Sequence, residues 1–261
     1  MIATLAVISF LNGLVSRSLG AISDVGFLAA LANTFEISVI VWLSLGLGVR
    51  FVWISPPSEL SRRDYWVLTG LLALTLVPLA ELSWIALSGI AAYGVLNSAK
   101  GTDLRRGSII LLAVSVPMFW SRVLFKAFAE YVLTFDAALV GLVSGQGNAG
   151  NTVTYADQSG YIWIAQSCSS LNNVSLAILC WITIIQLYAR SFAMRDLLWC
   201  LAACLSVVVI NVARLTLIVF FPAHFELIHG PIGGTIVAWM ILITTVAICL
   251  RGVGRAQAAH S

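Results

Sequence analysis

Apolar residues lie in long runs along this chain, and most polar and charged residues fall between the runs. A helix of about 20 apolar residues crosses a bilayer, so runs of this kind indicate membrane-spanning helices. The runs cover residues 2–16, 27–48, 65–80, 82–96, 108–120, 174–189, 197–221 and 232–250. The pattern therefore predicts an all-α polytopic membrane protein with about eight transmembrane helices.

The longest stretch between the runs is the segment of residues 121–173. Its residues 123–143 mix apolar side chains with charged ones at spacings typical of an amphipathic helix that lies on a membrane surface. Residues 145–151 are rich in Gly and Asn, which favours turns. The β-prone runs 152–155 and 161–164 follow and suggest a small β-hairpin.

The composition excludes a water-soluble globular protein. Hydrophobic residues make up 60% of the chain, charged residues only 10%, and the mean hydropathy is +0.99. The 14 basic and 11 acidic residues give a net charge of +3, which is too balanced to indicate a nucleic-acid partner. The 5 cysteines include no C-x-x-C pair, which argues against a disulfide framework or a zinc ribbon.

The distribution of basic residues predicts the orientation in the membrane, because cytoplasmic loops carry an excess of Lys and Arg. One set of alternate loops holds Arg50, Arg62, Arg63, Lys100, Arg105, Arg106, Arg190, Arg195, Arg251 and Arg255. The other set holds Arg17, Arg122 and Lys126. Both termini are therefore expected in the cytoplasm, with the segment 121–173 and the short loop 222–231 on the outer, periplasmic side.

Cys168 differs from the other cysteines in its surroundings. It lies among Gln, Ser and Asn just before an apolar run, where a helix N-terminus favours the thiolate. Cys180, Cys200, Cys204 and Cys249 lie inside apolar runs, where a thiol acts as a small hydrophobic group. We expect Cys168 to be the exposed, reactive thiol.

Arg214 is a charged residue inside a predicted span, which is costly and points to a function. One alternative is that its long side chain extends to the outer headgroups. Asn211, three residues earlier, lies on the same helical face and favours an inward polar stripe instead. His229 lies at the expected start of the last span, and a zinc site of His224, Glu226 and His229 would lack the H-E-x-x-H spacing. We expect no metal and no cofactor.

Cys168, Arg214 and His229 all fall at the outer ends of consecutive late spans. A thiolate nucleophile, a guanidinium that stabilises an oxyanion and an imidazole acid and base make a set for acyl transfer. Because all three candidate residues lie in the second half of the chain, we expect an N-terminal four-helix transmembrane region, residues 1–107, and a C-terminal catalytic region, residues 108–261, that includes the segment 121–173.

Three short motifs together resemble the exosortase and archaeosortase family of membrane cysteine transpeptidases. They are Cys168-Ser-Ser-Leu, Asn211-Val-Ala-Arg214 and His229-x-x-x-Gly233. The likeness covers residues 108–250. The family commonly has Cys-Ser-Gly, a hydrophobic residue and Arg, whereas this chain has Ser170 and Asn172 at the Gly and Arg positions, which indicates a divergent subfamily.

The resemblance implies an enzyme of the bacterial inner membrane whose site faces the periplasm. Its substrates would be membrane-anchored proteins with a C-terminal sorting signal: a short motif of the Pro-Glu-Pro type, a transmembrane helix and a basic tail. Cleavage would pass through a thioester on Cys168, with Ser169, Ser170, Asn172, Asn211 and Gly233 in supporting roles. Such substrates serve surface or extracellular-polysaccharide assembly.

Two other classes of function remain open from the sequence. A transporter or channel would use Arg214 to bind an anionic substrate. It would need a polar path across the bilayer, and the inner halves of the last three spans offer Gln186, Cys200, Cys204, Thr244 and Thr245 but no charge. A structural subunit of a membrane complex would tolerate replacement of Cys168.

Overall fold

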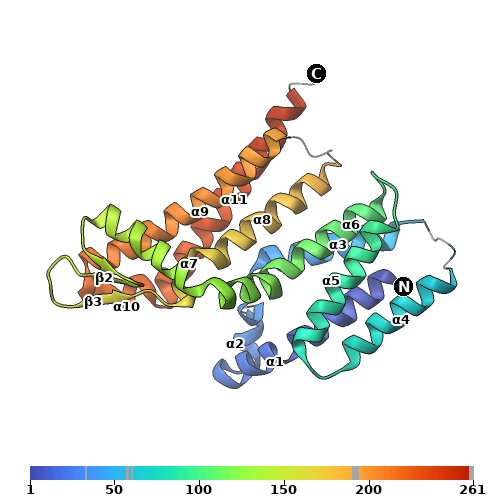
Figure 1. Cartoon of the computed structure of the whole chain (residues 1–261), viewed down its shortest axis with the longest axis horizontal. Coiled ribbons are helices and arrows are strands. Elements are labelled where there is room, and N and C mark those ends of the chain that lie inside the picture. Colours follow the sequence, from blue (N-terminus) through green and yellow to red (C-terminus); the bar gives the residue numbers. More distant parts are fainter. Residues whose placement is uncertain (33, 57–58, 60, 190–193, 259–261) are drawn as a thin grey trace. The chain divides into compact units, whose positions relative to one another are not determined.

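The structure is a computed structural model that describes residues 1–32, 34–56, 59, 61–189 and 194–258 (Figure 1). It divides the chain into two compact units. Unit 1 comprises Met1–Trp120 and Ile182–Ser191, and unit 2 comprises Ser121–Trp181 and Phe192–Ser261.

Unit 1 is a helical bundle. Its elements are α1 (Ile2–Val25), α2 (Phe27–Ala32), η1 (Thr34–Glu36), α3 (Val39–Ile54), α4 (Arg62–Leu76), α5 (Ala80–Leu96), α6 (Asp103–Ser115) and the π-helical turn η2 (Val116–Trp120). Helix α3 packs along α6, and α5 packs along both α1 and α6. Small polar side chains join the helices, as the 2.8 Å contact between the Ser9 and Thr75 hydroxyls shows. Contacts of this kind are typical of helices that pack inside a bilayer.

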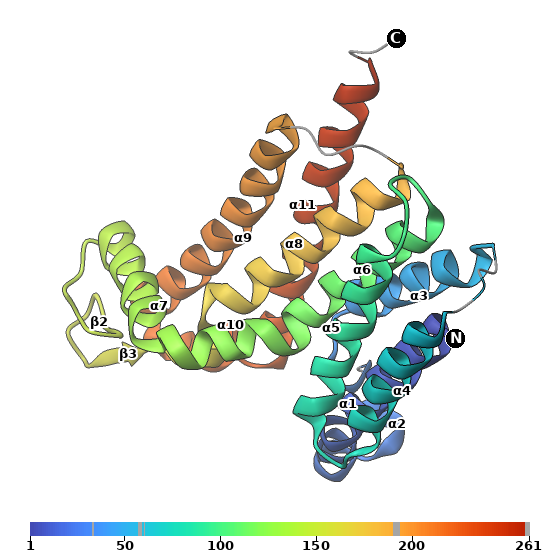
Figure 2. The ribbon, with the colours of Figure 1, turned by 45° about the vertical axis from the view of Figure 1, so that its right-hand side comes forward.

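Unit 2 begins with α7 (Ser121–Ser144) and a small sheet of β1 (Asn148–Ala149), β2 (Thr152–Thr154) and β3 (Tyr161–Trp163). It continues with η3 (Gln166–Cys168), α8 (Ser170–Leu187), α9 (Met194–Phe220), η4 (Pro222–His224), α10 (Phe225–His229) and α11 (Pro231–Ala258). The part of α8 from Ile182 onward belongs to unit 1. Figure 2 shows the strands near α7 and the C-terminal end of α9. Helices α9 and α11 pack along each other.

The helices make this chain a multi-pass membrane protein. Within the described residues, four helical runs are long and apolar enough to cross a bilayer: Ile2–Val25, Asp103–Ser144, Met194–Phe220 and Ile232–Gly254. Three shorter apolar helices, Val39–Ile54, Ala80–Leu96 and Asn173–Leu187, accompany them. The all-α membrane class is therefore confirmed. The number of eight spans and the orientation stay predictions.

The region after α6 differs from the expected break at residue 120. The helix does not end there: α6, η2 and α7 form one helical run of 42 residues, about twice the length that crosses a bilayer. The turn η2 and a non-helical backbone at Phe128 (φ −126°, ψ 20°) interrupt its regular geometry. The sequence prediction ended the helix where the apolar run stops, at residue 120. In the structure the polar and charged residues that follow remain helical.

Two loop predictions need correction, while the hairpin is confirmed. Strands β2 and β3 pair in antiparallel fashion, with Val153 opposite Ile162. The expected turn 145–151 contributes a third strand, β1, which pairs with β2. The expected loop 222–231 is mostly helical and contains η4 and α10.

Candidate active site

Cys168 is the last residue of η3, the short helical turn that joins β3 to α8. The Cys168 amide donates to the Ala165 carbonyl at 3.0 Å, which closes this turn. The side chain lies in an apolar cluster formed by α7, α9 and the sheet, and the residue is only 7% exposed. The expectation of an exposed thiol is therefore wrong. The sequence places polar neighbours around Cys168, but apolar side chains from distant segments bury it in the fold.

His229 meets the Cys168 thiol. Its Nε2 lies 3.0 Å from the Cys168 Sγ, within hydrogen-bonding distance. His229 is the last residue of α10 and not the first residue of the last span, as the sequence had suggested. Its ring stacks on Phe225, one turn earlier, with centroids 4.9 Å apart and planes inclined by 9°. This stacking fixes the imidazole plane beside the thiol.

Arg214 holds the end of the helix that carries His229. Its Nε donates to the Ile228 carbonyl at 3.2 Å, and its Nη2 donates to the His229 carbonyl at 3.1 Å. The last carbonyls of a helix lack partners in the helix and carry a partial negative charge, so a cation is favourable there. The guanidinium is half-buried, and two of its three nitrogens are bound to backbone.

Gly233 makes this arrangement possible. A Cβ at Gly233 would lie 2.2 Å from the Ile228 carbonyl oxygen and 2.5 Å from the Leu227 oxygen. Both atoms are backbone, so any side chain would displace α10. Gly233 thus lets α11 approach the carbonyl that also accepts from Arg214, which gives the His-x-x-x-Gly spacing a steric reason.

Asn211 fixes the chain around Cys168. Its Nδ2 donates to the Cys168 carbonyl at 2.8 Å and to the Ser170 hydroxyl at 3.1 Å. Asn211 and Ser170 are both buried, where each of these polar groups needs a partner. One turn of α9 therefore secures both the cysteine segment, through Asn211, and the histidine helix, through Arg214.

Asp136 belongs to the site and was not expected there. Its carboxylate accepts the Ser170 amide at 3.0 Å, although it is only 2% exposed. The Ser169 hydroxyl accepts the Leu171 amide at 3.3 Å. The first two amides of α8 are thus capped within the protein. The sequence did contain a hint of this role, because Asp136 is an acidic residue beside Ala137 and Val140 on the apolar face of the predicted amphipathic helix.

The remaining supporting residue, Asn172, follows directly in α8. Its side chain lies outside the described residues, whereas those of Ser169 and Ser170 are buried at the start of the helix. The structure therefore brings together Cys168, Arg214, His229 and Asn211. It places Gly233 against the carbonyls of Leu227 and Ile228 in α10.

The electrostatic surroundings lower the pKa of His229 below its ordinary value of 6.5. Burial of the imidazole is the largest cause, because it disfavours the charged form. The nearby Arg214 cation lowers the pKa further, and Glu226 opposes both effects. His229 is therefore a neutral base at pH 7, able to take a proton from the thiol.

A metal site was the alternative for the histidines. Among the described residues, no three His, Cys, Asp or Glu side chains gather closely enough to hold an ion. His224 instead packs edge-on against Phe221, with centroids 6.4 Å apart. The geometry assigns His229 to the thiol and gives His224 no share in that contact.

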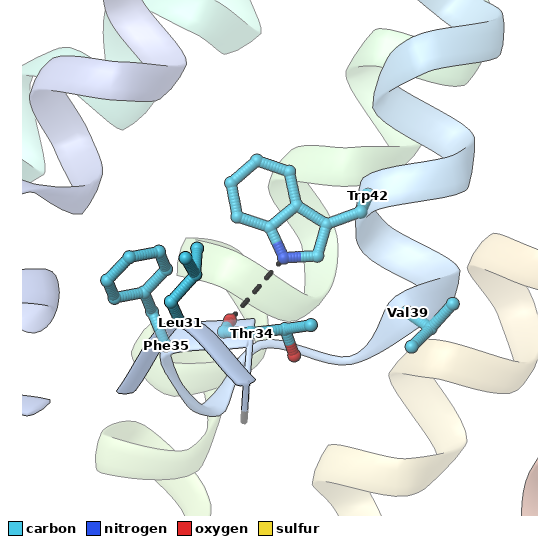
Figure 3. A pocket seen from close by; sticks show the side chains of 5 residues that line it. All are labelled: Leu31, Thr34, Phe35, Val39 and Trp42. Atoms are coloured by element: carbon cyan, nitrogen blue, oxygen red, sulfur yellow. Dashed lines mark hydrogen bonds between the residues drawn. The ribbon is translucent and has the colours of Figure 1, made fainter. Parts of the chain in front are cut away.

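Unit 1 contains an apolar cavity. It has a volume of about 260 Å³ and lies where η1 meets the start of α3 (Figure 3). Its lining residues are Leu31, Thr34, Phe35, Val39 and Trp42. The Trp42 indole N–H donates to the Thr34 carbonyl at 3.5 Å. No lining side chain carries a charge or a nucleophile beyond one hydroxyl, so acyl-transfer chemistry has no basis there.

Comparison with known proteins adds no relative to this picture: the chain matches no family model, no curated protein and no solved structure.

Proposed function

We propose that this protein is a cysteine peptidase or transpeptidase of the exosortase type, embedded in the bacterial inner membrane. It cleaves membrane-anchored proteins beside a C-terminal sorting signal on the periplasmic face. The observation that carries this proposal is the 3.0 Å contact between Cys168 Sγ and His229 Nε2. A thiol within hydrogen-bond reach of an imidazole is the basic unit of cysteine acyl-transfer enzymes.

The first half-reaction forms a thioester. His229 Nε2 accepts the Cys168 proton, and the thiolate attacks the scissile peptide carbonyl. The tetrahedral intermediate collapses as its C–N bond breaks, and the imidazolium gives its proton to the leaving amine. The lowered pKa of His229 supports this sequence, because the base starts neutral and its conjugate acid releases a proton readily.

The second half-reaction releases the acyl group. An amine or a water molecule attacks the thioester carbonyl while His229 takes the proton of the attacking group. The C–S bond then breaks, and the thiolate regains its proton from the imidazolium. The nature of the acceptor decides between transpeptidation and hydrolysis.

Arg214 acts mainly as a positioning residue in this scheme. Its contacts with the carbonyls of Ile228 and His229 hold α10, and its Nη1 has no bond among the described contacts. That nitrogen is the one left to stabilise an oxyanion. The transporter alternative would need the guanidinium to bind an anionic substrate. The two backbone bonds instead occupy the side of Arg214 that faces the histidine helix.

The test compares the C-terminal peptides of membrane proteins from cells that express wild type, Cys168→Ala or Cys180→Ala. Cys180 is a matched control because it is also buried, 5% exposed, and lies on α8. We expect proteins that end in a motif, an apolar helix and a basic tail to lose that tail with wild type and Cys180→Ala only. The same trimming with Cys168→Ala would overturn the proposal.

The proposed orientation has a separate test in spheroplasts. A membrane-impermeant maleimide should alkylate Cys168 from outside, slowly because the thiol is 7% exposed. Denaturation in detergent after quenching should then release no further Cys168 for labelling. Labelling of Cys168 only after lysis would place the site in the cytoplasm.

A further inference from the structure

The strand β3 leads directly to the nucleophile. β3 ends at Trp163, and Cys168 follows five residues later in η3. Five residues of chain reach at most about 17 Å. An extended peptide of four or five residues that lay along β3 would therefore reach the thiol.

Among the residues that the structure describes, one edge of β3 has no neighbour in the sheet. The strand order is β1, β2, β3, so β3 pairs only with β2. Ile164 donates to the Asn151 carbonyl and Tyr155 donates to the Gly160 carbonyl, both at 2.9 Å. With Val153 opposite Ile162, these bonds direct the main-chain groups of Ile162 toward β2.

The alternation of an antiparallel ladder then turns the main-chain groups of Tyr161 and Trp163 away from β2. No hydrogen bond described outside the β2 and β3 ladder uses either residue. Tyr161 is 66% exposed and Trp163 is 63% exposed, whereas Ile162 between them is 4% exposed and packs into the cluster that contains Cys168. The inner face of β3 is therefore covered and its outer face is exposed, while the main-chain groups of Tyr161 and Trp163 point to the edge away from β2.

We propose that the free edge of β3 binds an extended segment of the substrate polypeptide as an added strand and delivers its scissile carbonyl to Cys168. This inference rests on the proposed function and names how its substrate is held. An open strand edge offers unpaired donors and acceptors at fixed spacing, which an extended peptide matches through its own main chain. The exposed rings of Tyr161 and Trp163 border that edge and can contact alternate side chains of the bound segment.

Binding through the main chain of β3 can be distinguished from binding through side chains alone. Proline removes one N–H, and an edge strand tolerates it where that N–H faces outward. Trp163→Pro should therefore delete a docking donor and leave the ladder with β2 intact. Trp163→Ala loses the same ring but keeps the N–H, so it is the matched control. Ile162→Pro would break the ladder itself and reports the effect of a damaged sheet.

The probes are acetyl-tetra-alanyl chloromethyl ketone and its analogue with an N-methylated central amide. Each alkylates Cys168 by forming an S–C bond with loss of chloride, which mass spectrometry quantifies on the full-length protein in detergent. Chloroacetamide, which has no peptide, measures the reactivity of the thiol alone. The peptide probe needs no knowledge of the natural substrate, because strand addition uses main-chain groups.

We expect Trp163→Pro to slow the peptide probe about 3- to 10-fold more than Trp163→Ala does, the effect of one hydrogen bond. N-methylation should slow the wild type by a similar factor and the Pro variant little. Chloroacetamide should react with all of these variants at one rate. Equal rates for Pro and Ala, or no effect of N-methylation, would overturn the edge inference.

Two further outcomes separate the possible failures. If chloroacetamide reacts with Cys168 no faster in wild type than in His229→Ala, the proposed acyl-transfer function fails irrespective of the edge. If Trp163→Pro instead converts a dimer to a monomer in light scattering, the edge pairs two copies of the chain and the peptide inference is overturned.

Discussion

The side-chain amide of Asn211 on α9 bonds directly to the carbonyl of Cys168, with 2.8 Å between Nδ2 and the oxygen. The two residues are 43 positions apart in the chain. This bond ties the backbone of Cys168 to the same helix that carries Arg214. The position of the Cys168 backbone therefore depends on the side chain of Asn211.

Asn211→Asp should misplace Cys168, because a carboxylate in place of the Nδ2 donor faces the carbonyl oxygen with like charge. Two buried acceptors, the Cys168 carbonyl and the Ser170 hydroxyl, would lose their donor, at a cost of about 1 to 3 kcal/mol. Thermal unfolding and chloroacetamide alkylation in detergent measure both effects. Asn211→Gln keeps the amide and should recover part of each. An Asp variant as stable and reactive as wild type would contradict the role.

Arg214→Lys should lower cleavage about 10- to 100-fold. A lysine ammonium cannot hold the Ile228 and His229 carbonyls in the paired geometry of a guanidinium, and one charge-assisted bond lost has about this effect. The measurement is substrate cleavage at matched membrane expression. Arg122→Lys, on the exposed start of α7, is the control and should have no effect. Cleavage activity within a few-fold of wild type would show that a single positive charge is sufficient at this position and that the paired bonds of the guanidinium are not needed.

The pH dependence of kcat/KM should show an acidic limb below pH 6.5. His229 must be neutral to accept the thiol proton, and its pKa is lowered by burial and by Arg214, so activity is lost only as the pH falls through this lowered pKa. Glu226 opposes the lowering, so Glu226→Gln should move the limb to still lower pH. Glu130→Gln, on α7, should leave it in place. An acidic limb above pH 6.5 would contradict the lowered pKa of His229.

Asp136→Leu should destabilise the first turn of α8 by about 1 to 3 kcal/mol, because the buried Ser170 amide would lose its acceptor. Asp136→Asn keeps an oxygen at that place and should lose much less. Hydrogen exchange at the Ser170 and Leu171 amides distinguishes the two variants: Leu should expose the first amide, and Asn should protect it. Equal protection in both would show that the carboxylate does not cap the helix.

Gly233→Ala should disrupt the site, since its Cβ would meet the Ile228 carbonyl at 2.2 Å. The expected results are a loss of stability of about 1 to 3 kcal/mol, as in overpacked cores, and reduced alkylation of Cys168. Gly254→Ala on the same helix is the matched control, because nothing lies within 4 Å of its Cβ position. Differential scanning calorimetry in detergent reads the stability, and a neutral Gly233→Ala would contradict the steric argument.

Some of this site is predictable from the sequence for a topological reason. The outer ends of successive spans must share one membrane face, so Cys168, Arg214 and His229 could be grouped before any contact was known. The hairpin was predictable from its β-prone runs and the turn residues around them. The hairpin and the order of the spans depend on residues that are close in sequence, so the hydrophobic pattern and the turn residues are enough to predict them.

Other parts depend on contacts between distant segments and leave no local signal. Asp136 reaches Ser170 across 34 positions, and nothing near either residue specifies the pairing. The burial of Cys168 comes from α7, α9 and the sheet together, so its polar neighbours in sequence were misleading. The targets of Arg214 are carbonyls at the end of α10, and the sequence had assigned that stretch to a loop.

The burial of Cys168 also bears on how readily its thiol is oxidised. In the proposed orientation the thiol belongs to an oxidising compartment, where free cysteines are converted to disulfides or sulfenic acids. Oxidants and oxidoreductases attack a thiol according to its accessibility, and a residue that is 7% exposed offers them little surface. In the proposed orientation, the burial of Cys168 would therefore protect its thiol from oxidation.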